Sequence, residues 1–264
     1  HDKSAMTVGQ PTSTLASAFG AVLQALPAVP AEYKFQTVTT PTLPNSTRFE
    51  HWGASATQTY KVSDALTLKA ITAYRGLSSD DYIDIDATAV KLGDVLVAPD
   101  QTQVSQEVQA AYTNGAWNVV GGVYYLREKV TSHQEAYADA FVAPFTFLRT
   151  IDDSLTTTSW AGYVNASYSV SDALRVSAGL RYTQDEKKYF RTTSTFSNFA
   201  ALNGKFAFTA KESWDDVSPM VSVDYQANDD LFFYGRVAKG FKSGGFNGRA
   251  NNPGEEQPYN PETV

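Results

Sequence analysis

The chain has 264 residues, a formal net charge of −7 and no cysteine. This acidic balance provides no basic footprint for nucleic acid, and the absence of cysteine excludes a disulfide scaffold and thiol chemistry. No stretch approaches the ~20 apolar residues of a transmembrane helix, so any membrane span must be formed by β-strands.

The first 48 residues show no strand pattern and are expected to form a long loop. Within them, apolar residues from Leu15 to Val29 fall on one helical face and predict a short helix packed in that loop. The chain starts at His1 without the signal peptide that an exported protein needs, so the start of the protein is expected to be missing or removed.

Paired aromatic residues recur beyond this loop, always eight positions apart. The pairs are Trp52 with Tyr60, Trp117 with Tyr125, and Trp160 with Tyr168. An even spacing places both rings on one face of a strand, and eight residues cover about 26 Å of strand, or roughly 20 Å of height when tilted. This height matches the apolar band between the aromatic girdles of an outer-membrane β-barrel.

The residues between the rings alternate in polarity with a period of two. Val164, Leu180 and Val221 lie in stripes of apolar residues, whereas Arg175 and Arg181 lie on the opposite, polar stripe. The pattern predicts an all-β fold with antiparallel meander strands. Eight strands are expected, at about 49–62, 66–86, 103–113, 116–130, 157–170, 173–189, 213–227 and 231–246.

Tight turns alternate with long polar connections between these strands. Turn residues cluster near Asp64, Gly115, Asp172 and Asp229, and two of these turns share the sequence VSDAL. The long connections run from Gly76 to Gln101, from Thr131 to Leu155 and from Arg191 to Ser213. Outer-membrane barrels place short turns in the periplasm and long loops outside, so the four turns are expected at one end of the sheet.

A soluble β-sandwich is the alternative, because its strands also alternate and the mean hydropathy of −0.30 suits either class. The apolar stripes favour the barrel. They carry small residues, Val and Leu in the middle and Trp or Tyr at the ends, whereas a sandwich core distributes bulky residues throughout.

The ordered set of strands resembles the β-barrel of TonB-dependent outer-membrane receptors. The resemblance rests on LFFYGRVAKGFKSGGFNGR followed by PYNPETV, and on WAGYVNASYSVSDALRVSAGLRYTQDEK, WDDVSPMVSVDYQ, VSQEVQAAYTNGAWNVVGGVYYLREK and LTLKAITAYR. It implies a transmembrane barrel of about 22 strands in the outer membrane of a Gram-negative bacterium. It also implies active import of a scarce, bulky small-molecule ligand, such as an iron–siderophore complex, cobalamin or an oligosaccharide.

The family's partners are outer-membrane lipid, an N-terminal plug domain inside the barrel, and the inner-membrane TonB complex, which supplies energy through a short box on the plug. Neither plug nor box is found here, and the chain stops at Val264 as PYNPETV leads toward another strand. We therefore expect an internal piece: residues 1–48 as an extracellular loop, 49–246 as barrel strands, and 247–264 as an extracellular loop and the start of the next strand. The alternative is a small stand-alone barrel with a structural or adhesin role.

No catalytic machinery is evident, so we expect neither an enzyme nor a cofactor. The histidines His1, His51 and His133 are scattered, and no nucleophile elbow, phosphate loop or metal-spaced Cys/His set occurs. An acidic cluster has enough oxygen donors for Ca²⁺ if its loop folds around the ion, but it lacks the regular spacing of a calcium loop, which favours a solvated acidic loop. Its members are Asp80, Asp81, Asp84 and Asp86.

Polar residues that face the barrel interior are the candidate functional residues. Those expected near the outer ends of their strands, where a ligand would meet them, are Arg75, Tyr124, Glu128, Tyr163 and Arg181. Those expected to face the plug or channel water are Lys69, Glu107, Gln109, Asn165, Arg175 and Asp224. Each could instead merely solvate the lumen. Aromatic residues of both parities leave the facing of Arg236 and Lys239 open.

Overall fold

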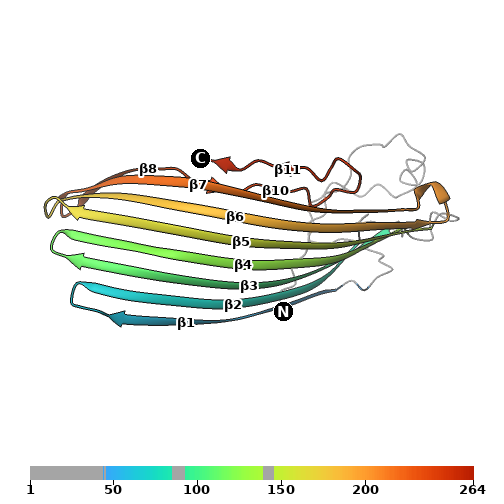
Figure 1. The fold of residues 1–264 in the computed structure, drawn as a ribbon, viewed down its shortest axis with the longest axis horizontal. Coiled ribbons are helices and arrows are strands. Elements are labelled where there is room, and N and C mark those ends of the chain that lie inside the picture. The colour runs from blue at the N-terminus through green and yellow to red at the C-terminus, as the bar shows by residue number, and fades with distance from the viewer. Residues whose placement is uncertain (1–43, 45, 85–92, 139–145) are drawn as a thin grey trace, which may run out of the picture.

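One long antiparallel sheet makes up most of the computed structural model, which describes residues 44, 46–84, 93–138 and 146–264. Its eight strands pair in sequence order, as the predicted meander requires (Figure 1). The strands are β1 (Thr47–Lys61), β2 (Leu66–Asp84), β3 (Gly93–Asn114), β4 (Trp117–Ala138), β5 (Phe147–Ser169), β6 (Leu174–Ser197), β7 (Gly204–Asn228) and β8 (Leu231–Ala238). Within the described residues the sheet stays open, with β1 and β8 at its edges.

Short elements complete the described chain. A single 3-10 turn, η2 (Ala200–Leu202), joins β6 to β7. After β8 the chain forms two small antiparallel pairs, β9 (Phe241–Lys242) with β12 (Glu262–Thr263) and β10 (Gly245–Phe246) with β11 (Pro258–Tyr259). No helix in the described ranges is long and apolar enough to cross a membrane. The helix expected between Leu15 and Val29 lies outside the described residues.

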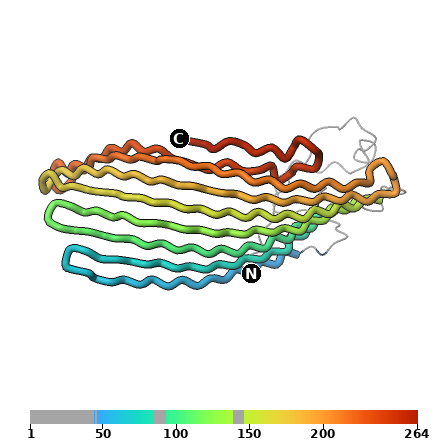
Figure 2. The backbone as a smooth tube through the Cα atoms, viewed as in Figure 1, coloured from blue at the N-terminus to red at the C-terminus, as the bar shows by residue number. Residues whose placement is uncertain are grey.

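The four tight turns lie together at one end of the sheet, as the alternation of turns and loops predicted (Figure 2). The repeated VSDAL sequence forms the same turn twice: Ser63 Oγ accepts the backbone N–H of Leu66, and Ser171 Oγ accepts that of Leu174, both at 3.1 Å. Gly115 adopts a φ of 55°, the left-handed conformation that an Asn-Gly hairpin turn requires.

The strands extend much further toward the opposite end than expected. Most of the three connections expected as long loops is paired strand: β4 continues to Ala138, β6 continues to Ser197 and β7 begins at Gly204. Backbone pairing does not need an apolar face, so polar, Thr-rich segments continue the ladder after the apolar alternation has faded. By contrast, β8 ends at Ala238, earlier than the predicted residue 246.

The two faces of the sheet differ as the period-two pattern predicted. Val164 is 47% exposed on one side of β5, whereas Ala161 is 6% exposed on the other. We call the side that carries Val164 the apolar face and the opposite side the polar face. Ring pairs bound the apolar face: Trp52 with Tyr74 and Tyr125 with Trp160 away from the turns, and Trp117 with Tyr168 near them.

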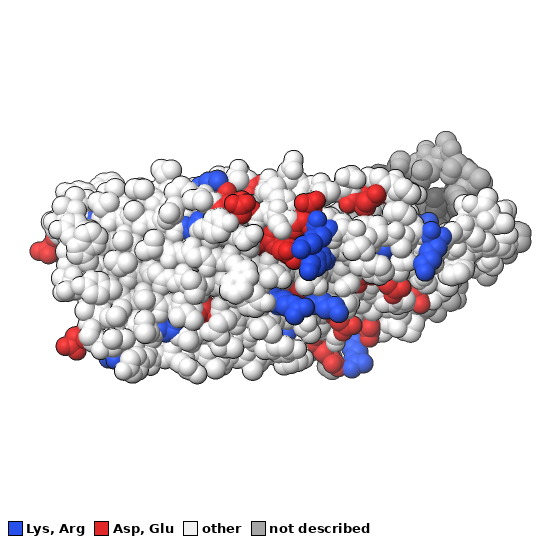
Figure 3. Space-filling view, in the orientation of Figure 1, with Lys and Arg blue, Asp and Glu red and all other residues white. Residues whose placement is uncertain are grey.

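The surface between these ring pairs is the apolar band. A broad region with few charged side chains occupies the turn end of the molecule in Figure 3, and Lys, Arg, Asp and Glu gather beyond it. Exposed apolar side chains in the band are Leu68, Val104, Val108, Val123, Val164, Val176, Leu180, Val217 and Val221. An exposed apolar surface of this extent marks contact with lipid or protein.

The register of β5 can be tested by charge insertion. Val164 lies midway between Trp160 and Tyr168, so Val164→Arg in the full-length protein should cost about 2–4 kcal/mol in folding into bilayers. Asn165→Arg, one residue further and on the polar face, is the matched control and should cost much less. Folding free energies measured in phospholipid vesicles would check this, and equal penalties would contradict the assignment of faces.

Candidate functional site

Five polar-face side chains from four strands, Arg181 among them, form one cluster. The Cζ of Arg181 lies 6.0 Å from the ring centroid of Tyr124 and 5.8 Å from that of Tyr163, within cation–π range. The Tyr163 hydroxyl donates a hydrogen bond of 2.5 Å to Glu107 Oε1, and Gln109 Nε2 donates to the same oxygen at 3.0 Å. We call these five residues the Arg181 cluster.

The strand ladder builds the Arg181 cluster. Tyr163 on β5 is directly opposite Arg181 on β6, and Tyr124 on β4 is directly opposite Glu107 on β3. Gly122 makes room for the Tyr163 ring, because a Cβ at position 122 would lie 2.8 Å from the Tyr163 hydroxyl oxygen and 2.7 Å from the Val108 carbonyl oxygen. A larger residue at position 122 would therefore displace Tyr163 from Glu107.

The cluster unites residues that sequence analysis divided between two roles. Tyr124, Tyr163 and Arg181 were expected to meet ligand, whereas Glu107 and Gln109 were expected to face the plug or channel water. The cluster also lies at the level of the apolar band, since Tyr163 falls between Trp160 and Tyr168, while β6 continues past Arg181 to Ser197. Tyr124, Tyr163 and Arg181 therefore lie well inside their strands and not near the outer ends, where they were expected.

The other predicted residues lie on the polar face but outside the cluster's contacts. Glu128 accepts a hydrogen bond from Gln101 Nε2, and Arg175 forms a 2.8 Å ion pair with Asp224 near the turns. Lys69 is directly opposite Gln109, and Arg75 is directly opposite Gln103. Asn165 places its Nδ2 only 3.0 Å from where a Cβ at Gly179 would be.

The acidic cluster has a different structure from the expected loop. Asp80 and Asp81 are consecutive residues of β2, so their carboxylates leave opposite faces, and Asp81 Oδ2 accepts a 2.8 Å hydrogen bond from Ser79. Asp84 ends the strand, and Asp86 lies outside the described residues. Across the described ranges, no group of three or more His, Cys, Asp or Glu side chains could hold a metal ion.

An ion pair that sequence analysis missed lies on the polar face of the extended strands. Arg191 is 2% exposed, and its Nη1 donates to Asp153 Oδ1 at 2.9 Å and Oδ2 at 2.8 Å. The Tyr189 hydroxyl donates to Asp153 Oδ1 at 2.9 Å. Burial raises the pKa of Asp153 above its ordinary value, and the nearby Arg191 charge opposes that shift. Both residues fell in connections expected to be loops, so their pairing across β5 and β6 was not foreseen.

The Arg191–Asp153 pair anchors the chain that follows β8. Arg191 Nη1 donates to the carbonyl of Gly248 at 2.9 Å, and Nη2 donates to Asn251 Oδ1 at 3.2 Å. We call Phe241–Asn251 the returning segment. It also packs through Phe246, whose ring stacks on Tyr189 with centroids 5.8 Å apart. The segment therefore covers part of the polar face of β6 and β7.

The register now orients Arg236 and Lys239. Arg236 is directly opposite Ser222, a polar-face residue of β7, and Lys239 Nζ bonds to the carboxylate of Asp216, which also lies on the polar face.

The returning segment requires a glycine at position 244. A Cβ at Gly244 would lie 2.3 Å from the Tyr259 carbonyl oxygen and 2.6 Å from Trp214.

A histidine lies on the opposite side of the extended strands. His133 Nδ1 is 2.7 Å from Asp152 Oδ1, and its Nε2 is 3.2 Å from Glu135 Oε1. The hydrogen bond to Asp152, with a smaller contribution from Glu135, raises the pKa of His133 above its ordinary 6.5. Glu135 also accepts a hydrogen bond from the Tyr137 hydroxyl, which raises the pKa of Tyr137 to about 12.

Comparison with known proteins gives one family and a consistent group of relatives. The model of the family described as TonB dependent receptor-like, beta-barrel matches residues 7–264. The pesticin receptor of Yersinia pestis is 28% identical over 146 residues, which cover 54% of this chain and 20% of that protein. The pesticin receptor of Yersinia enterocolitica is 27% identical over the same length. The aligned region thus spans about a fifth of these curated relatives.

Solved structures share the fold. The ferric yersiniabactin uptake receptor FyuA of Yersinia pestis superposes with a TM-score of 0.70 at 19% identity, covering 82% of this chain and 32% of that one. The siderophore receptor PiuA of Acinetobacter baumannii gives a TM-score of 0.51 at 14% identity, covering 75% and 33%. The ferric citrate transporter FecA gives 0.53 at 14% identity, covering 74% and 28%.

The anchoring role of the buried ion pair leads to a prediction about local stability. Asp153→Asn leaves the Arg191 guanidinium buried without its counter-charge, which should destabilise the docked returning segment by about 3–5 kcal/mol. Amide hydrogen exchange of residues 245–251 should accelerate correspondingly. The matched control is Asp152→Asn, whose side chain leaves the opposite face of β5. Unchanged protection in Asp153→Asn would refute the anchoring role.

The His133 contacts predict a pH effect with a definite sign. Because the folded pKa is raised, protonated His133 stabilises the β4–β5 pair fully below about pH 6.5, and this contribution is lost as the pH rises through the folded pKa. Asp152→Asn should lower the pKa of His133 toward its ordinary value, whereas Asp100→Asn, on neighbouring β3, should not. Titration of the imidazole by NMR in detergent micelles measures both, and equal values in the two variants would count against the Asp152 contact.

Proposed function

Since this chain belongs to the family of TonB-dependent receptor β-barrels, we propose that the full-length protein is an outer-membrane receptor that imports a scarce, bulky nutrient with TonB-coupled energy. Receptors of this family are transporters, so the chain is not an enzyme. The Gram-negative outer membrane is the proposed location. The apolar band would contact lipid, and the polar face would contact the plug domain and the ligand pathway.

An iron–siderophore or similar iron-chelate complex is the ligand class that we propose. The supporting observation is the Arg181 cluster, in which a guanidinium lies beside the rings of Tyr124 and Tyr163 on the polar face. Iron chelates present carboxylate, phenolate or hydroxamate oxygens, and a guanidinium with neighbouring aromatic faces suits both the charge and the flat groups of such molecules. The names of FyuA, FecA and PiuA refer to iron-related ligands of those proteins, which supports the same class.

A carbohydrate is the second ligand class, because tyrosine rings also stack on sugars. The small stand-alone barrel with a structural or adhesin role is less well supported. In the described residues β1 and β8 leave their outer edges unpaired, and each unpaired backbone group in hydrocarbon costs several kcal/mol. Additional strands on both sides, as in a large receptor barrel, would remove that cost.

Growth experiments can separate these functions. A strain that lacks the gene should lose growth on specific ferric chelates under iron limitation and should grow normally on oligosaccharides as sole carbon source. Uptake of ⁵⁵Fe-labelled chelates by the parent strain should require an intact TonB system. Loss of growth only on an oligosaccharide would indicate that the imported ligand is a carbohydrate. Normal growth of the deletion strain in both conditions would refute the proposed import function.

The Arg181 cluster predicts the effect of a single charge removal. Arg181→Gln should weaken binding of the imported ferric chelate to the purified full-length receptor about tenfold or more, the usual effect of losing a hydrogen bond to a charged group. Lys205→Gln, which removes an exposed cation from the other side of the sheet, is the control and should leave affinity unchanged. Equal affinities for the wild type and Arg181→Gln would show that the Arg181 cluster does not bind the ligand.

A further inference from the structure

Four basic side chains gather on the apolar-face side of the sheet, just beyond the apolar band. They are Arg127 and Lys129 on β4, Lys188 on β6 and Lys211 on β7, and they flank Thr156 and Thr158 on β5. We call these six residues the basic groove. Figure 3 shows basic side chains, with acidic ones among them, next to the region that carries few charges.

The ladder places these residues in two neighbouring rows. Lys129, Thr156, Lys188 and Lys211 are successive partners across β4, β5, β6 and β7. Arg127 is directly opposite Thr158 in the adjacent row. Strands are about 4.8 Å apart, so the cations flank a shallow gap about two strands wide, whose floor carries threonine hydroxyls. A depression of about 340 Å³ occupies this place, lined by Tyr125, Arg127, Thr156, Thr158, Glu186 and Lys188.

The positive charge of the basic groove is only partly balanced. Lys188 and Lys211 are directly opposite each other, an arrangement of like charges that destabilises a strand pair. The carboxylate of Glu186 is shared between them, 2.9 Å from Lys211 Nζ and 3.4 Å from Lys188 Nζ. Two other carboxylates lie on this side of the sheet near the groove. Asp215 is two residues from Ser213 on β7, toward the turns, and Asp100 on β3 is diagonally next to Lys129. An additional anion between the cations would relieve the repulsion.

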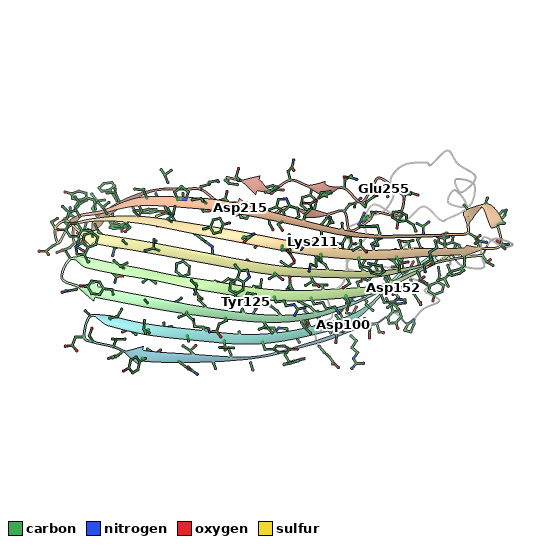
Figure 4. All side chains as sticks on the ribbon, in the orientation of Figure 1. Asp100, Tyr125, Asp152, Lys211, Asp215 and Glu255 are labelled. Carbon is green, nitrogen blue, oxygen red and sulfur yellow. The ribbon has the colours of Figure 1, made fainter. Side chains whose placement is uncertain are left out.

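The position of the groove indicates the source of that anion. Tyr125 lines the groove and stacks with Trp160 at 4.4 Å between centroids, and this ring pair bounds the apolar band. Figure 4 labels Tyr125 on β4 and Lys211 on β7, and Lys211 lies further from the turns than Tyr125. A site for a soluble anion would not need an apolar surface next to it. An amphiphile would place its polar head in the groove and its chains on the band.

We infer that the basic groove binds the phosphate headgroup of a phosphorylated lipid of the outer leaflet, whose acyl chains cover the apolar band below Tyr125 and Trp160. The cations contact phosphate oxygens, and the hydroxyls of Thr156 and Thr158 donate hydrogen bonds to the same oxygens. The inference rests on the proposed location in the outer membrane. It concerns the outside of the barrel wall and is independent of the imported ligand.

Lipid binding to the purified full-length receptor in a neutral detergent tests this inference. The probes are lipid A with both phosphates, the same lipid A after enzymatic dephosphorylation, and inorganic phosphate. Lys188→Gln combined with Lys211→Gln should weaken binding of phosphorylated lipid A about thirty-fold, because each basic residue near an anionic surface contributes about fivefold. Dephosphorylated lipid A should bind the wild type and the double variant alike.

Glu186→Gln provides an outcome of opposite sign. Removing the carboxylate that the two lysines share should tighten binding of phosphorylated lipid A about fivefold, a change that a general loss of structure would not produce. Arg48→Gln is the matched control, because Arg48 is an exposed cation on the same side of the sheet that is already ion-paired with Glu50. Its affinity for phosphorylated lipid A should equal that of the wild type.

Three results would overturn the inference: no loss of affinity in the double lysine variant, weaker binding in Glu186→Gln, or an equal loss in Arg48→Gln. Displacement of phosphorylated lipid A by millimolar inorganic phosphate would instead identify a site for soluble anions and would also overturn it. Uptake of labelled ligand measured in the same strains keeps the two proposals distinguishable. Failure of import in the wild type would refute the proposed function and leave the lipid measurement valid.

Discussion

The constraint on which the structure depends is that every backbone N–H and C=O in hydrocarbon must find a partner within the protein. The β1–β8 ladder meets this requirement for its interior strands by pairing each with both neighbours. Because the ladder fixes register, and side chains alternate with a period of two, one set of hydrogen bonds determines both faces at once. Val164 is directed to one side and Tyr163 to the other, and a slip of one residue would exchange them.

Register also assembles groups of side chains that are far apart in the chain. Glu107, Tyr124, Tyr163 and Arg181 each come from a different strand and meet on the polar face. On the other side, Lys129, Lys188 and Lys211 align across the sheet through the same hydrogen bonds. Neither group requires a special local conformation or a loop. The rigid ladder therefore positions chemistry that other folds usually place on loops.

Sequence patterns predicted the parts of this structure that depend on a single strand or a single turn. The spacing of Trp160 and Tyr168 gave the facing of β5, and VSDAL gave the turns because the serine that closes each turn is local. Relations between strands could not be predicted in the same way. The meeting of Arg191 with Asp153 depends on β5 and β6 continuing through Thr-rich segments in which apolar alternation has faded. The face that Arg236 occupies could not be predicted, because aromatic residues lie on both faces of β8 and the apolar alternation is lost there.

The continuation of paired strands beyond the outer ring pairs has a consequence for selectivity. From Trp160 to Phe147, β5 alone continues for 13 residues, about 43 Å along the strand at 3.3 Å per residue. If the polar face lines the ligand pathway, as proposed, an incoming molecule would pass this length of paired strand before it reached Arg181. Exclusion by size would then occur at the rim, and discrimination by charge would occur deep inside. Changes at this outer end of the strands would then alter which molecules are admitted without altering the Arg181 cluster.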